Sequence, residues 1–444
     1  MEIRLKHTII KKTIPILFLC LLYSSCSKDS SDNPEQEAEE MEMEEPGTDG
    51  GTGTGEEPAN QAPDAFNLTS LENNTEDATR LPSLTWEAAT DPENDPITYT
   101  VYLDTVNPPT SLYAEGITTT NIQVEPRLSL FTDYFWSVTA SDDKEASTES
   151  TPFSFTTRNL DIPEVATVTS ASFSARRQAA SSVYDTKMWL VGGLDEDSNF
   201  QNDVWQSENG TDWTETTDNA EFSGRWNHTL TTFDNKLWVI GGYDGDDYLN
   251  DVWQSENGTE WTQVTQTASF PIRGRHTTLV YDNKIWLIGG YNGSSLGDVW
   301  YSEDGAEWIE ATNTAAFGSR SLHASVVFDE KLWLIAGTDG TRRNDVWYSE
   351  DGMEWIQVDQ SNAFSPRILH TAVVYDNKIW VMGGSNPGTI GDIWYSENGS
   401  KWFQIIEEHP FPERSSHTSL VFDDKIWLLA GYDGDERNDV WTFD

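Results

Sequence analysis

The chain has 444 residues, a formal net charge of −48 and two cysteines. This length can bury large hydrophobic cores. The strong negative charge disfavours nucleic-acid binding and adhesion to an anionic membrane surface, because both need a positively charged protein face. Both cysteines, Cys20 and Cys26, lie at the start of the chain, so no disulfide is expected in the globular part.

Residues 1–25 are predicted to be a lipoprotein signal peptide. Basic residues up to Lys12 precede an apolar run from Ile14 to Tyr23, which is too short to span a bilayer. Small residues then precede Cys26, and this order resembles the lipobox of bacterial lipoproteins. The resemblance implies acylation of Cys26 and an outer-membrane lipoprotein exposed at the cell surface. An ordinary cleaved signal peptide with an incidental cysteine is the alternative.

Residues 26–61 are predicted to be a disordered acidic tether. They are rich in Glu, Asp, Gly, Ser and Pro and include the run Glu35–Glu45. Such a composition cannot bury a hydrophobic core.

Residues 62–158 predict a β-sandwich. Apolar residues alternate over Ser83–Glu87, Ile97–Leu103 and Tyr134–Ala140, which predicts strands. One pattern resembles fibronectin type III domains around their tyrosine corner, and it consists of Leu128, Thr132, Tyr134, Trp136 and Val138. The resemblance implies a seven-stranded spacer or binding module.

An acidic turn interrupts this region at Asp91, Glu93 and Asp95. Its carboxylates are suitable calcium ligands. A plain turn between two strands is the favoured interpretation, so no metal site is predicted.

A unit of 47 to 49 residues recurs six times over residues 163–444. Each copy has an apolar strand that starts at Trp and ends in Gly-Gly or Ala-Gly, as in Trp238–Gly242, and later an Asp-Val-Trp or Asp-Ile-Trp triplet. A period of this length built from short strands is typical of propeller blades. The stretch Glu164–Thr169 precedes the first copy and is predicted to complete the last blade, which lacks its outer strand.

The repeated residues resemble those of the kelch family. The matching features are the Gly-Gly pairs, an Arg-x-x-His lead and the Asp-Val-Trp triplet. The resemblance implies an all-β fold, a six-bladed kelch-type β-propeller preceded by the fibronectin type III-like β-sandwich. Kelch propellers include enzymes, scaffolds and glycan binders, so the fold leaves the function open.

One arginine occupies the same position in every blade, just before the innermost strand. The six are Arg176, Arg225, Arg273, Arg320, Arg367 and Arg414. Gathered at one mouth of the central channel, they would form a cationic site for acidic groups. The structural alternative, which the repetition favours, is that each guanidinium bonds backbone carbonyls or the Asp of a neighbouring blade.

Histidines follow three residues after five of these arginines, with Ala179 in the first blade. Symmetry would hold them too far apart for one ion, so they are predicted to be satisfied histidines of the inner strands. The loops that differ between blades carry aromatic residues suited to stacking on sugars: Trp226, Tyr243, Tyr248, Tyr291 and Tyr432. Partly buried loop packing is the alternative for these.

The sequence favours a binding module over an enzyme. No nucleophile elbow, phosphate loop or propeller cysteine is present, and no catalytic residue or cofactor is predicted. We expect a monomer, anchored to the membrane by its lipid, that engages a glycan or protein partner at the cell surface. A carbohydrate-active kelch enzyme, such as a sugar epimerase or mutarotase, is the first alternative, and a structural spacer is the second.

Overall fold

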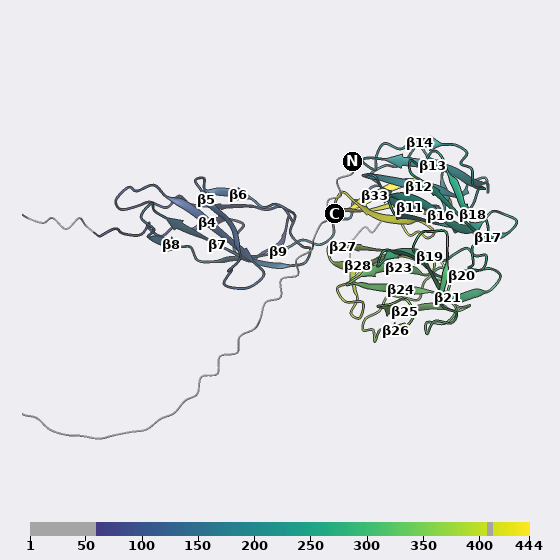
Figure 1. Cartoon of the computed structure of the whole chain (residues 1–444). Coiled ribbons are helices and arrows are strands. Elements are labelled where there is room, and N and C mark those ends of the chain that lie inside the picture. The colour runs from purple at the N-terminus through teal and green to yellow at the C-terminus, as the bar shows by residue number, and fades with distance from the viewer. Residues whose placement is uncertain (1–58, 406–411) are drawn as a thin grey trace, which may run out of the picture. The chain divides into compact units, whose positions relative to one another are not determined.

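The computed structural model describes residues 59–405 and 412–444. The predicted signal peptide, Cys26 and residues 26–58 of the predicted tether lie outside this described part. Every regular element within it is a β-strand (Figure 1). Accordingly, no described segment forms a helix of the length and apolarity needed to cross a bilayer.

Residues 68–157 form two sheets around a shared core. One sheet has the order β1-β3-β6, and the other has the order β2-β9-β7-β4-β5, with β8 paired to β7. The strands predicted at residues 83–87, 97–103 and 134–140 are confirmed as β3, β4 and β7, with ends shifted by one residue. The bounds are β1 (Leu68–Ser70), β2 (Thr75–Ala78), β3 (Ser83–Trp86), β4 (Thr98–Asp104), β5 (Leu112–Ile117), β6 (Asn121–Gln123), β7 (Asp133–Ser141), β8 (Ser147–Glu149) and β9 (Phe153–Thr157).

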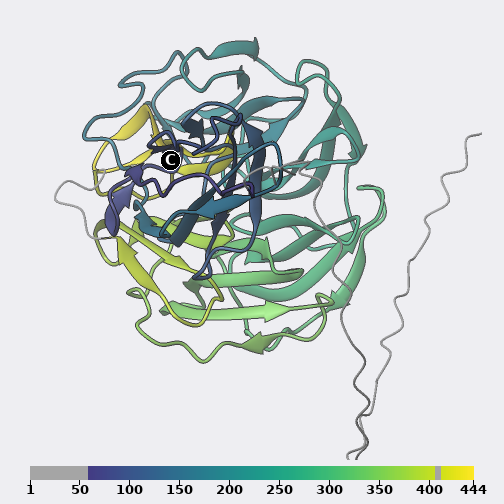
Figure 2. The ribbon, with the colours of Figure 1, turned by 90° about the vertical axis from the view of Figure 1, so that its left-hand side faces the viewer.

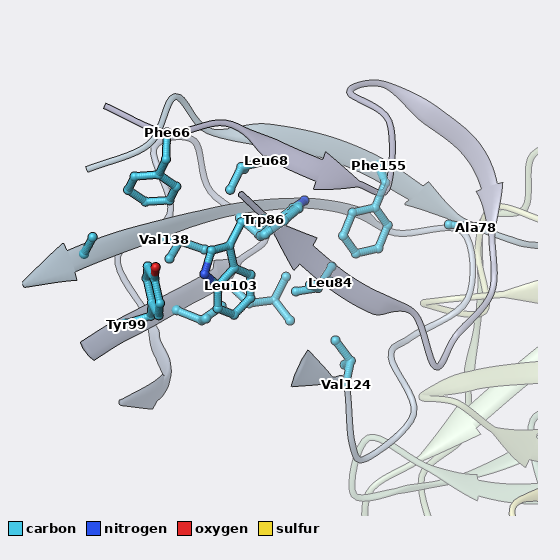
Figure 3. Close-up of a cluster of buried hydrophobic side chains, with 13 residues drawn as sticks. Phe66, Leu68, Ala78, Leu84, Trp86, Tyr99, Leu103, Val124, Val138 and Phe155 are labelled. Atoms are coloured by element: carbon cyan, nitrogen blue, oxygen red, sulfur yellow. The ribbon is translucent and has the colours of Figure 1, made fainter. Parts of the chain in front are cut away.

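The core of these two sheets follows from strand alternation. Successive side chains of a strand point to opposite faces, so Tyr99, Val101 and Leu103 of β4 all turn inward. They meet Leu84 and Trp86 of β3 in one cluster (Figure 3), where the rings of Trp86 and Tyr99 pack edge to face with centroids 5.5 Å apart. Burying each large apolar side chain contributes about 1.5–3 kcal/mol.

The repeat region builds sheets on a common plan, in which antiparallel strands lie side by side in chain order. The first strands are β11 (Ala180–Tyr184), β15 (Thr229–Phe233), β19 (Thr277–Tyr281), β23 (Ala324–Phe328), β27 (Thr371–Tyr375) and β31 (Thr418–Phe422). The second strands, almost wholly buried, are β12 (Lys187–Asp195), β16 (Lys236–Tyr243), β20 (Lys284–Tyr291), β24 (Lys331–Thr338), β28 (Lys378–Ser385) and β32 (Lys425–Tyr432).

The Asp-Val-Trp and Asp-Ile-Trp triplets lie on the third strands, and the fourth strands form the outer edges. The third strands are β13 (Phe200–Ser207), β17 (Tyr248–Ser255), β21 (Ser295–Ser302), β25 (Arg342–Ser349), β29 (Thr389–Ser396) and β33 (Glu436–Phe443). The fourth strands are β14 (Thr214–Thr217), β18 (Thr262–Thr265), β22 (Ile309–Thr312), β26 (Ile356–Gln357) and β30 (Phe403–Ile405).

The sheets succeed one another around a common centre, and the C-terminal strands come to lie beside the first ones of the repeat (Figure 2). The short strand β10 (Arg176–Arg177) pairs with both β12 and β33, which joins the first copy to the last. The strand predicted at residues 164–169 is reduced to one antiparallel bridge, in which Val168 and Val440 exchange both backbone hydrogen bonds at 3.0 and 2.8 Å. It still covers the free edge of β33.

Two kinds of turn hold each sheet together. Between the first two strands, a pair such as Asp282 and Asn283 adopts positive φ at both positions (48° and 55°), which makes a tight two-residue turn. An Asn-Gly or Asp-Gly pair stands before the outer strand, but it does not form such a turn, because only its glycine has positive φ. There Asn257 accepts the amides of Thr259 and Glu260 through its side-chain oxygen, which builds a longer loop.

Candidate ligand-binding face

The six repeated arginines are buried inside their own sheets. Arg225 donates from Nη1 and Nη2 to the two carboxylate oxygens of Asp251, at 2.8 and 2.9 Å, and from Nη1 to the carbonyl of Gly241 at 2.9 Å. Trp253 Nε1 donates to the same carboxylate at 2.7 Å. The arginine, the Gly-Gly pair and the Asp-Val-Trp triplet of the repeat are therefore parts of one internal network.

The same network recurs in every copy. No side chain of the six arginines is more than 2% exposed, and their partners are Asp203, Asp251, Asp298, Asp345, Asp392 and Asp439. A cationic focus at the channel mouth does not form, because each guanidinium is covered and neutralised by a carboxylate. This agrees with the favoured structural alternative except in one respect: each aspartate belongs to the same copy as its arginine and not to a neighbouring blade. The geometry gives the ligand role predicted for these arginines no support.

A ring of histidines lines the channel. Burial and, second, the nearby charge of Arg225 together lower the pKa of His228 to about 3. Burial is also the main cause that lowers the pKa of the other four histidines. All five are therefore neutral imidazoles at neutral pH. Thr277 and Thr371 lie 2.9 Å from the Nε2 atoms of His323 and His417. The ring nitrogens of His228 and His370 make no hydrogen bond of good geometry, and the backbone of Val191 and Ile335 is the polar group that faces them.

The residue just before each histidine position faces the channel mouth. These six residues all have positive φ and are Gln178, Asn227, Arg275, Leu322, Leu369 and Ser416. With the histidines they line a cavity of about 140 Å³, and a second cavity of about 280 Å³ lies against the same histidines and the inner strands. The mouth is asymmetric: one side is polar and cationic, whereas the side at Leu322 and Leu369 is apolar.

Sequence reasoning missed these six residues. The sequence does mark this position. The residue varies between copies, whereas the arginine two positions earlier is the same in all six copies and the histidine that follows is the same in five. In a symmetric repeat, a variable position between constant ones is the place where copies can differ in what they bind.

The aromatic residues predicted from the variable loops come together beside this mouth. Tyr243 and Tyr248 have ring centroids 5.0 Å apart, and Tyr248 and Tyr291 are 5.7 Å apart. Phe200, which was not predicted as a site residue, joins Tyr243 to Trp226 through edge-to-face contacts at 6.1 Å. We call Trp226, Phe200, Tyr243, Tyr248 and Tyr291 the aromatic belt. All five side chains are half-buried, so each keeps an accessible part.

Two arginines lie beside the aromatic belt, and they differ in whether a carboxylate pairs with the guanidinium. The Arg177 guanidinium lies between Trp226 and Tyr432, at 5.8 and 5.1 Å from the ring centroids, and it pairs with the Glu436 carboxylate at 3.4 Å. Tyr432 is thereby linked to the belt only through Arg177.

Arg275 is different. Its guanidinium lies 4.9 Å from the centroid of the Tyr291 ring, and among the described residues no carboxylate is within 4.0 Å of it. Its Nε is buried without a hydrogen-bond partner. Arg275 therefore places an uncompensated positive charge where the belt meets the channel mouth, on a chain whose net charge is strongly negative.

Comparison with known proteins identifies the repeat region. A family model described as the KLHDC2/KLHL20/DRC7 Kelch-repeats domain matches residues 129–337 and 303–444, which is more than half of the chain. A comparison with curated proteins found no match. The solved structure titled "Structure of YjhT" aligns with a TM-score of 0.52 and 15% sequence identity over 62% of this chain and 95% of that chain, a likeness of fold alone. The chain therefore belongs to the Kelch-repeat domain family, and its repeat region is a kelch-type β-propeller.

Proposed function

We propose that this protein is a lipoprotein of the outer membrane, exposed at the cell surface, that binds a carboxylate-bearing glycan through the loop face of its propeller. The observation that carries the proposal is the contact between the aromatic belt and the unpaired guanidinium of Arg275. Kelch repeats generally mediate protein interactions, and a protein partner rich in acidic side chains is the competing outcome of the test below.

The chemistry of the belt suits a sugar. Aromatic faces offer a flat apolar surface to the C–H groups of a pyranose ring, while the tyrosine hydroxyls supply hydrogen bonds at the rim. Half-buried rings that brace one another lose little conformational freedom on binding. The belt takes residues from three successive copies of the repeat, long enough for more than one sugar unit to lie across it.

Arg275 supplies the preference for acidic sugars. A guanidinium binds a carboxylate through two parallel hydrogen bonds, which are stronger than those between neutral groups. Because no carboxylate in the described part of the chain neutralises Arg275, a ligand carboxylate does not have to displace one of these. Gln178 and Asn227 line the same cavity and add amide groups for the sugar hydroxyls.

The enzyme alternative finds no support at the channel mouth. The residues lining the mouth cavity include no Asp or Glu. The histidines there have a pKa of about 3 or are held well below their ordinary value by burial, so they are poor proton donors and acceptors at neutral pH. The spacer alternative is disfavoured because the face is hollowed and carries an unpaired charge.

Each predicted segment of the chain would have its own role at the cell surface. A lipid on Cys26 would hold the chain at the membrane, the acidic tether of residues 26–61 would extend it, and a fibronectin type III-like sandwich at residues 62–158 would present the six-bladed propeller of residues 163–444. The Tyr134 hydroxyl accepts the Ser129 amide at 3.2 Å, a short upstream bond of the tyrosine-corner kind, which supports the sandwich assignment. We expect the protein to act as a monomer.

The test is a glycan array probed with the purified full-length chain. We expect saturable binding to glycans that carry uronic or other carboxylated sugars and weak binding to their neutral counterparts. Equal binding to neutral and acidic glycans would show that Arg275 does not select for a ligand carboxylate. No binding to any glycan, together with capture of an acidic protein at the cell surface, would replace the glycan by a protein partner.

A further inference from the structure

Three aspartates of the two sheets formed by residues 68–157 converge at one place. Asp91 and Asp95 belong to the turn between β3 and β4, and Asp142 follows β7, about 50 residues later. One carboxylate oxygen from each lies within 4.8 Å of the other two. The sequence favoured a plain turn at Asp91, and Glu93 of that turn bonds Gln61 instead of joining the group.

The turns use only some of these carboxylate oxygens as hydrogen-bond acceptors. Asp91 Oδ1 accepts the backbone amides of Glu93 and Asp95, both at 2.9 Å. Its second oxygen, Oδ2, is fully buried and has no hydrogen-bond partner, and the residue as a whole is only 9% exposed. A buried carboxylate oxygen without a partner is costly, so a cation at this oxygen would relieve a real deficit.

Asp142 is arranged in the same way. Its Oδ1 accepts the amides of Lys144 and Ala146, at 2.8 and 2.9 Å, and its Oδ2 accepts Asn60 Nδ2 at 2.7 Å. Asn60 Oδ1 is a second buried oxygen without a partner. Asp142 is 6% exposed, so two of the three carboxylates lie almost entirely out of solvent.

The charges at the site are not balanced. Among the described residues, the cation that pairs with the cluster is Lys144, whose Nζ lies 2.6 Å from Asp95 Oδ2 and whose side chain is half exposed. Three carboxylates and one ammonium leave a formal charge of two negative units. A divalent cation would neutralise that charge.

We propose that Asp91, Asp95 and Asp142 bind a calcium ion. All candidate ligands are oxygens, and the group contains no histidine or cysteine, which favours a hard cation over zinc. Calcium–oxygen distances of about 2.3–2.6 Å allow ligands on opposite sides of one ion to lie roughly 5 Å apart. The spacing of these carboxylates fits that limit, and water would complete the coordination.

The ion would tie together two turns that are distant in sequence, the turn after β3 and the turn after β7. Asn60 is attached to the second turn through its hydrogen bond to Asp142. The consequence is a calcium-dependent stability of the sandwich at the end where the chain enters it. This inference does not depend on the proposed function of the propeller.

Calorimetric titration of the chelator-treated full-length chain with CaCl₂ tests the site. We expect a saturable site with a Kd on the order of 10⁻⁴–10⁻³ M, the range of extracellular calcium modules. D91N and D142N should each weaken binding by at least about tenfold, because each removes a charged ligand. Asn keeps the oxygen that accepts the turn amides, so both variants should keep the fold.

The matched control is D143N, which removes an exposed carboxylate next to the site. It should bind calcium as the unaltered chain does, and calcium should raise the unfolding temperature of both. D95N serves as a third test if circular dichroism shows either buried variant to be misfolded. Absence of saturable binding up to 10-fold above that Kd range, binding unchanged in D91N and D142N, or equal affinity for magnesium would each overturn the assignment.

Discussion

The backbone amide of Gln178 donates to the carbonyl of Ser416 at 2.8 Å, and this bond joins the first copy of the repeat to the last. The equivalent residue of each following copy donates to the one before it, through Asn227, Arg275, Leu322, Leu369 and Ser416. Six backbone hydrogen bonds thus encircle the channel mouth. The ring fixes where each of these side chains sits, so the residues that line the mouth are held by backbone rather than by their own contacts.

Ring closure at the outer edge should depend on Val168. V168P removes the amide that donates to Val440, and we expect a loss of about 1–3 kcal/mol, the usual cost of an unpaired buried group. Urea unfolding followed by tryptophan fluorescence measures it. V165P is the control, because Val165 is 69% exposed and makes no such bond. Equal effects of the two prolines would argue against closure by this segment.

The buried ion pairs should carry much of the stability of the propeller. D251N leaves the Arg225 guanidinium buried without its counter-charge, and we expect a loss of about 3–5 kcal/mol. D339N breaks the exposed pair with Arg343 and should cost less than about 1 kcal/mol. Thermal unfolding compares the two. A small effect of D251N would mean that the repeated arginines are not structural, and would reopen their predicted ligand role.

The glycines of the outer loops should be intolerant of a side chain. A Cβ on Gly258, which has a φ of 73°, would lie 2.0 Å from the Trp189 ring of the neighbouring sheet. G258A should therefore cost at least about 2 kcal/mol from strain and overpacking. Gly388 has no neighbour within 4 Å, and G388A should change the unfolding temperature little. Comparable losses in both variants would contradict the packing of adjacent sheets described above.

The histidine ring should make the propeller acid-sensitive. The folded pKa of His228 is about 3 and its ordinary value is 6.5, so between these values the unfolded chain binds the proton and the folded chain does not. Stability is therefore full above pH 6.5 and falls as the pH drops toward 3, by about 2 kcal/mol for one such histidine at pH 5.

H228A isolates this effect, because the first copy already has Ala179 at the equivalent position. The variant should lose less stability than the unaltered chain between pH 7 and pH 5, whatever its stability at pH 7. Guanidinium unfolding at the two pH values gives the comparison. An unchanged pH dependence would mean that His228 is protonated in the folded protein.

The repeat predicted the second and third strands and their tryptophans well, because a continuous apolar run and a recurring triplet are local signals. It favoured a structural role for the arginines, but it did not identify the aspartate with which each one pairs. Arg225 reaches an aspartate 26 residues later, and only the pairing of β16 with β17 brings the two together. Whether a repeated arginine faces solvent or its own sheet is a property of packing.

The candidate site was predicted in part. Tyr243, Tyr291 and Tyr432 end the second strand at equivalent positions, so the repeat placed them on one face. Arg275 was missed because it stands at a position that differs between copies, and Phe200 was missed because its partners come from the next copy. Convergence of Asp142 on Asp91 could not be read from the sequence either, since it depends on how two distant turns meet.

The most direct test of the account compares R275A with R343A in binding to a carboxylated glycan selected on the array. Among the described residues Arg275 has no carboxylate partner, whereas Arg343 is an exposed arginine of β25 paired with Asp339, 2.6 Å away. Isothermal titration should show at least about a tenfold loss of affinity for R275A, as for loss of a charge-assisted hydrogen bond, and no change for R343A. Equal affinities of the two variants would contradict the binding of a ligand carboxylate at Arg275.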